Sequence, residues 1–164
     1  MYKTVLVTSA LAMGASDARL FKNPRYTGAY DIVTQEVILN VSIGEYPVGK
    51  VTIGLFGDVL PKTCKNFYHL CKGDKKNRWK RKMQFKDMPV LKNHKDWTII
   101  TGDYISKDGT TNRSIYGGTF EDEGYTIKPR AGIVGMYSEG ERHTNGSKFF
   151  VMFKNAYGDD WYDM

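Results

Sequence analysis

Apolar and polar residues alternate along two neighbouring segments of the chain, residues 34–43 and 50–55. The apolar positions are Val37, Leu39, Val41 and Ile43 in the first segment and Val51, Ile53 and Leu55 in the second. A period of two is typical of strands that bury one face. Residues 44–47 between them contain Gly44 and Pro47, which favour a turn, so we predict an antiparallel hairpin.

The pattern then changes to the period of a helix. Pro61 suits the first turn, because its missing N–H is not needed there. Apolar residues recur at three- and four-residue spacing at Cys64, Phe67, Leu70 and Cys71. This spacing predicts an amphipathic helix. Gly73 fits the residue that follows the helix in a left-handed conformation.

Three more short strands are predicted at residues 98–101, 132–136 and 148–153. Residues 107–118 are rich in Gly, Thr and Asn and are interpreted as a loop. Many short strands with one clear helix favour a mainly β fold, a barrel or a sandwich capped by that helix.

The first 18 residues have the features of a signal peptide. Lys3 supplies a positive charge, residues 4–15 form a modest apolar run, and residues 16–18 (SDA) fit a cleavage site. Residues 12–14 (AMG) are a competing cleavage site, and the alternative is a buried or disordered N-terminal segment. We predict a leader at 1–18, a linker at 19–33 and one domain at 34–164. A leader indicates the secretory pathway, either the endoplasmic reticulum or secretion; the alternative is a cytoplasmic protein.

The length of 164 residues suits one domain, and an apolar content of 41% is enough for a core. The formal charge is +6, and residues 72–82 alone hold seven Lys or Arg and one Asp. We interpret this run as a solvated loop; an electrostatic contact with nucleic acid or an acidic membrane is the alternative. A leader would keep the run away from nucleic acid, so no nucleic-acid partner is predicted. No apolar run is long enough to span a bilayer.

Cys64 and Cys71 lie seven residues apart on the predicted helix, about 10 Å at its rise per residue. That separation is too long for a disulfide, so two free thiols are expected. His94 has no cluster of metal-ligating residues around it in the sequence, and we predict no metal site and no cofactor.

Three motifs lie between Thr34 and Phe153. The first joins Gly54-Leu55-Phe56-Gly57 to Pro61-Lys62-Thr63, Asn66-Phe67 and Leu70-Cys71; the second joins Gly102-Asp103-Tyr104 to Gly109-Thr110, Ser114-Ile115-Tyr116-Gly117 and Phe120-Glu121-Asp122-Glu123; the third joins Gly135-Met136 to residues 144–150 (TNGSKFF). Together they resemble the cyclophilins, a family of peptidyl-prolyl cis-trans isomerases, and most of all its secretory-pathway members.

The resemblance implies an eight-stranded antiparallel barrel closed by two helices. It also implies rotation about X–Pro peptide bonds, which faces a barrier of roughly 18–20 kcal/mol. In this family an apolar pocket holds the proline ring and an arginine is aimed at the prolyl nitrogen. That donor stabilises the lone pair that the nitrogen gains as the amide twists.

The register of the resemblance places the family's catalytic arginine at Lys92. Lysine keeps the charge but loses the planar fork of donors, so we expect weakened catalysis. The resemblance assigns substrate-binding positions to Trp97, Thr98, Ile100, Tyr137, Ser138, Lys148 and Phe150 and, once a gap is opened in the match, to Tyr157. Trp97 and Phe150 keep the aromatic character of the pocket, whereas Ile100 removes a donor for the substrate carbonyl.

The resemblance fades after Phe153, and the family's last two strands and second helix have no counterpart. We therefore expect a cyclophilin-like barrel that is incomplete at the C-terminus, with strand edges unpaired. Two functions stay open: an isomerase with weakened activity, or a non-catalytic module that binds proline-containing segments or a partner. A monomer and proline-containing polypeptide partners are expected, with cyclosporin-type ligands as candidates if the pocket is preserved.

Overall fold

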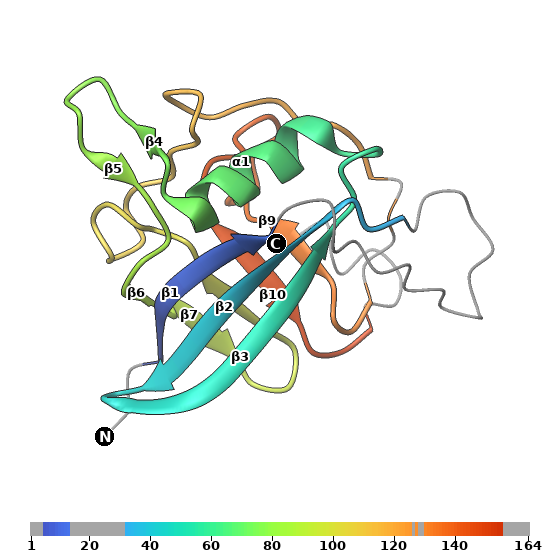
Figure 1. The fold of residues 1–164 in the computed structure, drawn as a ribbon. Helices are drawn as coiled ribbons and strands as arrows, with labels where there is room; N and C mark the ends of the chain where they lie inside the picture. The colour runs from blue at the N-terminus through green and yellow to red at the C-terminus, as the bar shows by residue number, and fades with distance from the viewer. Residues whose placement is uncertain (1–4, 14–31, 126, 128–129, 156–164) are drawn as a thin grey trace.

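The computed structural model describes residues 5–13, 32–125, 127 and 130–155. In chain order the elements are β1 (Val5–Met13), β2 (Gln35–Ile43), β3 (Tyr46–Leu55), α1 (Pro61–Lys72), β4 (Lys75–Lys76), β5 (Lys82–Met83), β6 (Met88–Pro89), β7 (Lys92–His94), β8 (Thr98–Thr101), β9 (Val134–Met136) and β10 (Phe149–Met152). Strands dominate, and α1 lies across one end of them (Figure 1). The predicted mainly β fold with a capping helix is confirmed.

The first sheet has the strand order β3-β2-β1-β6. The predicted hairpin is confirmed as β2 and β3, but its turn is shorter than predicted, because Tyr46 already pairs with Ile43. A register shift after Val41 changes which side chains face inward. Ser42, predicted on the polar face, is therefore buried.

The second sheet has the strand order β7-β8-β10-β9. All of its pairs are antiparallel, with Phe149 opposite Thr101 and Met136, and Phe150 opposite Ile100 and Gly135. β8, β9 and β10 lie within the three segments predicted as strands. Opposite residues share a face, so this register divides the side chains between the core and the outside.

The core lies between the two sheets and beneath α1. Three aromatic side chains connect these parts: the ring of Phe67 on α1 lies 5.3 Å from that of Phe85 and 5.0 Å from that of Phe149, centroid to centroid. The buried apolar cluster comprises Val37, Leu39, Ile53, Leu55, Cys64, Phe67, Leu70, Cys71, Met83, Phe85, Met88 and Phe149. All four helical positions predicted to be apolar contacts are in this cluster.

Each end of α1 is held by a different means. At the C-terminal end, Gly73 has φ +67° and its N–H donates to the carbonyl of His69, as predicted for a left-handed cap. At the N-terminal end Leu60 offers no capping side chain. The carboxylate of Glu123 takes that role from 60 residues away, accepting from the N–H groups of Lys62 (2.8 Å) and Thr63 (2.6 Å).

The core is not fully covered between β3 and β9, which stand at the ends of their sheets in the strand order. Val51 on β3 lies opposite the buried Leu39 and therefore faces the same side as the core. Even so, Val51 is 43% exposed. An apolar opening into the core therefore lies beside β3.

Residues 72–82 differ from the predicted loop. Lys75 pairs with Met83 and Lys76 with Lys82, which makes β4 and β5 a short hairpin. Met83 is buried in the core, and this anchor gives the hairpin a fixed base. The basic side chains themselves are exposed, as predicted. Among the described residues, no helix has both the length and the apolar character needed to cross a membrane.

β1 lies within residues 1–18, the segment predicted to be a leader. In the structure it lies between β2 and β6 and pairs with both, with Val5 opposite Ile43 and Met13 opposite Glu36. A strand in this position covers the edge of β2. Cleavage after Ala18 would remove it, so the same residues cannot serve as a cleaved leader and as β1 in one mature chain. Residues 19–31 of the predicted linker lie outside the described residues, and Val33 is buried in the core.

We expect removal of residues 1–18 to destabilise the fold, because it leaves the backbone groups along one edge of β2 unpaired. The fragment 19–164 should melt at least about 10 °C below the full chain or lose its cooperative transition. Circular dichroism during heating measures this. Deletion of residues 1–4, which precede β1, is the control and should change little. Equal melting temperatures for 19–164 and the full chain would show that β1 is dispensable.

Candidate functional site

Three of the predicted site residues form a row across three strands. Lys92 on β7 lies opposite Ile100 on β8, and Ile100 lies opposite Phe150 on β10. Opposite residues share a face, and the neighbouring Phe149 points into the core. The row therefore lies on the side of this sheet away from the core, which we call the outer face.

The register also places Thr98 on the outer face, opposite Met152. Thr98 is fully buried, and its hydroxyl donates to the carbonyl of Val151 at 3.0 Å. Ile100 is also buried. Thr98 thus contributes packing to the outer face, and its hydroxyl is already engaged within the sheet.

The outer end of the Phe150 ring lies against the backbone of β9 at Gly135. A Cβ atom at Gly135 would come within 2.5 Å of Cζ of Phe150, so the ring occupies the space that any other residue would fill. The ring is half-buried. Gly135 therefore allows the Phe150 ring to pack closely against β9 on the outer face. This role of Gly135 was not predicted from the sequence.

Tyr137 lies between two lysines. The Nζ atoms of Lys92 and Lys148 are each 5.9 Å from the centre of its ring, within the range of a cation–π contact. The N–H of Tyr137 donates to the carbonyl of Lys148 at 2.9 Å, which continues the ladder of β9 and β10. Tyr137 thus brings the two cations to one part of the outer face.

Lys148 is buried, with 2% of its surface exposed, and its ammonium group is engaged inside the protein. It donates to the carbonyl of Gly109 at 2.8 Å and forms an ion pair with the carboxylate of Glu139. A buried charge needs such partners. Lys148, predicted to contact substrate in place of a glutamine, therefore has its donors directed at its own chain. The pairing of Lys148 with Glu139 was not predicted, because Glu139 is not one of the residues that form the third motif.

A second set of hydrogen bonds supports this lysine. The side-chain oxygen of Asn112 accepts from the N–H groups of Ser147 (2.8 Å) and Lys148 (2.9 Å), and its amide donates to the carbonyl of Thr144 at 3.0 Å. Asn112 therefore connects the loop of residues 107–118 to the start of β10. Its side chain occupies the space beside Gly146, which has no side chain to exclude it.

Asp103 organises the loop that presents Gly109. Its carboxylate is buried and accepts from the N–H groups of Ile105, Ser106, Gly109 and Thr111 and from the hydroxyls of Ser106 and Thr111. Burial by itself raises the pKa of Asp103, but these hydrogen bonds outweigh it and hold the pKa well below its ordinary value. The loop is thus built around one ionised carboxylate.

The remaining predicted site residues are not part of the row or of the cluster around Tyr137. Trp97 is half-buried in the β7–β8 turn, with its ring 5.9 Å from that of the exposed His94. Ser138 accepts a hydrogen bond from Thr144 through its carbonyl. Tyr157 lies outside the described residues. The structure brings together Lys92, Ile100, Tyr137, Lys148 and Phe150.

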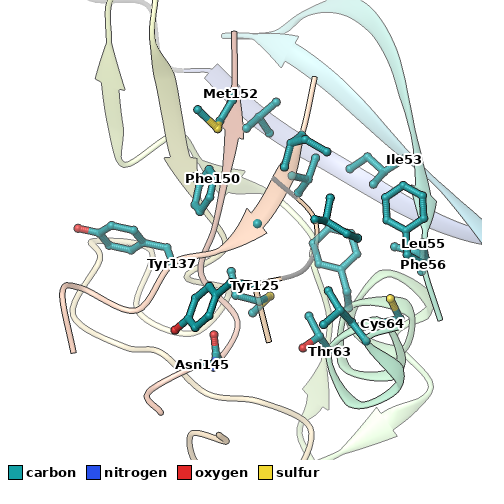
Figure 2. Close-up of a pocket in the computed structure, with 18 of the residues that line it drawn as sticks. Ile53, Leu55, Phe56, Thr63, Cys64, Tyr125, Tyr137, Asn145, Phe150 and Met152 are labelled. Carbon is teal, nitrogen blue, oxygen red and sulfur yellow. The ribbon is translucent and has the colours of Figure 1, made fainter. Parts of the chain in front are cut away.

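A cavity of about 1420 Å³ lies on both sides of β9 (Figure 2). Phe150, Tyr137 and Tyr125 line it on one side, and Ile53 and Leu55 of β3 line it on the other. Its lining does not include Lys92, Trp97, Thr98 or Ile100. The cavity is therefore mainly the opening into the core beside β3, and it meets the outer face at Phe150, Met152 and Tyr137.

The cysteines give no support to nucleophilic chemistry. Both are free and buried, as predicted. Burial raises the pKa of Cys64 to about 12, with a smaller contribution from the charge of Glu123. Such a thiol stays protonated at neutral pH and is a poor nucleophile. Within the described part of the chain, no group of three or more His, Cys, Asp or Glu side chains could hold a metal ion.

The profile of one protein family, cyclophilin-type peptidyl-prolyl cis-trans isomerase/CLD, matches residues 38–163. The chain belongs to the cyclophilin family. The matched range includes β3, α1 and the whole second sheet with its outer face. The family resemblance of the sequence is thus confirmed; the roles of individual site residues stay predictions.

Curated cyclophilins agree with the profile. Peptidyl-prolyl cis-trans isomerase CYP21-1 of Arabidopsis thaliana is 40% identical over 73% of this chain and 54% of its own length. Peptidyl-prolyl cis-trans isomerase CYP22 of the same plant is 36% identical over 77% of this chain and 62% of its own length. A third relative, from Bos taurus, carries the name "Probable inactive peptidyl-prolyl cis-trans isomerase-like 6" and is 35% identical over 73% of this chain and 39% of its length. The chain thus spans about half the length of these cyclophilins.

We expect Gly135→Ala to cost about 1–3 kcal/mol of unfolding free energy, because the new methyl group overlaps the Phe150 ring. In a Phe150→Ala background the same substitution should cost less than about 0.5 kcal/mol, since the overlap is gone. Urea unfolding of the four proteins measures this coupling. Gly118→Ala is the matched control, because a Cβ there meets nothing within 4 Å. Additive effects at Gly135 and Phe150 would contradict the contact.

We expect acid to destabilise the protein partly through Asp103. Its pKa is lowered by folding, so its stabilisation is complete above the unfolded value of about 3.9 and is lost as the pH falls below that value. Asp103→Asn should cost about 2–3 kcal/mol at pH 7 and should lose less stability than the wild type between pH 5 and pH 3. Urea unfolding across this range measures the difference. Asp96→Asn, at an exposed turn position, is the control. Equal acid dependence of wild type and Asp103→Asn would exclude this role.

Proposed function

We propose that this cyclophilin is a peptidyl-prolyl isomerase of low turnover that acts on X–Pro bonds in polypeptide segments lying across β7, β8 and β10. The observation that carries the proposal is the row of Lys92, Ile100 and Phe150 on the outer face. It offers a cation at one end and an apolar, aromatic surface at the other. Those are the two elements that the family resemblance assigns to catalysis of prolyl rotation.

The proline ring is taken by the aromatic end of the row. Phe150 lies over Gly135, and Ile100 beside it is buried, so this end has a firm apolar floor. Cross-strand neighbours have Cβ atoms about 5 Å apart, so Lys92 starts two such steps from Phe150. An extended lysine side chain covers about half of that gap, so its ammonium group can reach the nitrogen of a proline whose ring lies on Phe150 and whose amide points toward Lys92.

The chemical step is stabilisation of the twisted amide. When the X–Pro bond rotates, the nitrogen loses conjugation and gains a lone pair, and the ammonium group of Lys92 donates to it. No bond is broken and no cofactor is required. Catalysis follows only if this donor contacts the twisted amide better than the planar one.

Two features support a low rate. Lys92 is exposed, so its ammonium group is hydrated and must shed water before it donates. The second cation nearby, Lys148, has its donors directed at Gly109 and Glu139. The outer face therefore presents one flexible donor in place of a fixed planar one.

A second candidate function is binding of proline-containing segments without turnover. The engagement of Lys148 within the protein favours it, because a donor held by Glu139 is not available to a substrate carbonyl. The name of the Bos taurus relative also fits this alternative. Both functions use the same aromatic end of the row, and they differ at Lys92.

Exchange between cis and trans forms of a proline peptide, followed by two-dimensional NMR, separates the two. We expect exchange above the uncatalysed rate with wild type, a rise of roughly ten- to a hundredfold with Lys92→Arg, and loss with Phe150→Ala. Lys95→Arg, at an exposed position in the adjacent turn, is the matched control. Peptide-induced shifts without exchange in wild type and Lys92→Arg would establish the binding function. No shifts and no exchange from folded protein would exclude both.

A further inference from the structure

The excess positive charge of the chain lies in one short segment. The chain has 24 Lys and Arg and 18 Asp and Glu. Residues 72–82 hold seven of the basic residues and one of the acidic ones, so the rest of the chain carries 17 of each sign. The acid, Asp74, is paired with Lys72 and with His69 on α1. Residues 75–82 consequently hold six basic side chains and no acid: Lys75, Lys76, Arg78, Lys80, Arg81 and Lys82.

These six side chains are exposed on the hairpin of β4 and β5. Among the described residues, none of them forms an ion pair with an acid. Lys76 and Lys82 lie directly opposite each other, an arrangement of like charges that destabilises a strand pair. A hairpin that keeps this repulsion in its own structure would be stabilised by an anionic partner.

The tip of the hairpin is held in a defined shape. The side-chain oxygen of Asn77 accepts from the N–H groups of Trp79 and Arg81, both at 3.0 Å. Its backbone N–H donates to the carbonyl of Arg81, and its carbonyl accepts from Lys80. Such bonds from an Asn side chain are typical of a tight turn. The tip is thus preorganised, which lowers the entropy cost of binding.

This arrangement holds Trp79 outward. The side chain is 56% exposed although tryptophan is a large apolar residue, and the guanidinium group of Arg78 lies 4.0 Å from the ring centre. The hairpin of β4 and β5 projects from the rest of the molecule (Figure 1). Trp79 lies between these two strands in the sequence, with Arg78 and Lys80 as its neighbours. Its indole has an apolar body and a polar N–H, a combination that favours the boundary between lipid and water.

We propose that the β4–β5 hairpin is a docking surface for membranes that contain anionic lipids, with Trp79 entering the headgroup layer and the six basic side chains contacting lipid phosphates and carboxylates. A projecting tip with one aromatic residue fits a flat, extended surface. Single-stranded nucleic acid is bound instead in grooves with several stacked aromatic residues. The buried Met83 connects the hairpin to the core, so docking would fix the orientation of the whole domain.

Co-sedimentation of the full chain with vesicles tests the proposal. Vesicles of phosphatidylcholine with about 30% phosphatidylserine are compared with pure phosphatidylcholine at about 0.15 M salt. We expect binding to the anionic vesicles only, with a blue shift of tryptophan emission that is absent in Trp79→Phe. Each basic residue near an anionic surface contributes about fivefold in affinity, so Lys76→Gln/Arg78→Gln/Lys82→Gln should bind roughly a hundredfold more weakly.

A second triple variant, Lys50→Gln/Lys65→Gln/Lys107→Gln, is the matched control. It has the same net charge as the hairpin triple variant, and its three substituted positions are exposed. It should bind like the wild type. Equal losses in the two triple variants would reduce the effect to net charge and overturn the docking surface. Binding that disappears between low salt and 0.15 M would also overturn it, because screened surface charges alone behave in this way. Tighter binding to a single-stranded oligonucleotide than to the anionic vesicles would assign the hairpin to nucleic acid and contradict the proposal.

Discussion

The alternation of side chains along β10 sets both the core and the outer face. Phe149 points inward, where its ring lies 5.0 Å from that of Phe67 and 5.4 Å from that of Phe85. Its neighbour Phe150 must then point outward, where it lies over Gly135. A slip of one residue between β10 and β8 would exchange the two phenylalanines. The packing of Phe149 under α1 therefore also fixes the position of the aromatic residue that we propose to hold proline.

Charge on the outer face is arranged around Tyr137. Lys148 is neutralised by Glu139 and buried, whereas Lys92 is exposed, and both approach the same ring. The buried lysine makes its contacts within the protein, and the exposed one is the cation to which our proposal assigns the ligand. Asp103, which is buried, and Asn112, which is half-buried, hold the loop and the strand that confine Lys148, so the site depends on two polar groups outside the row itself.

The edges of the two sheets are treated differently. β1 pairs with β2 and β6, so the edge of β2 is covered by the N-terminal segment. The side between β3 and β9 remains open, and Val51 is exposed there although it faces the core. An N-terminal segment that is needed as a strand constrains any role as a cleaved leader, because the two roles compete for the same residues.

The sequence by itself determined the β2–β3 hairpin, α1, the strands β8, β9 and β10, and the family. Alternation specified β2 and β3, the spacing of Cys64, Phe67 and Leu70 specified α1, and three motifs specified a cyclophilin, because all of these depend on residues that are close in the chain. The candidate site residues were assigned from the register of the family resemblance. Only the tertiary structure decided which donors are free: Lys148 meets Glu139 and Gly109, and Glu123 caps α1 from 60 residues away. Contacts between residues far apart in the chain leave no periodic signal, since each is made once and depends on how the sheets pack. For the same reason, the pattern of residues 5–13 favoured a leader, and their pairing with β2 and β6 became visible only in the fold.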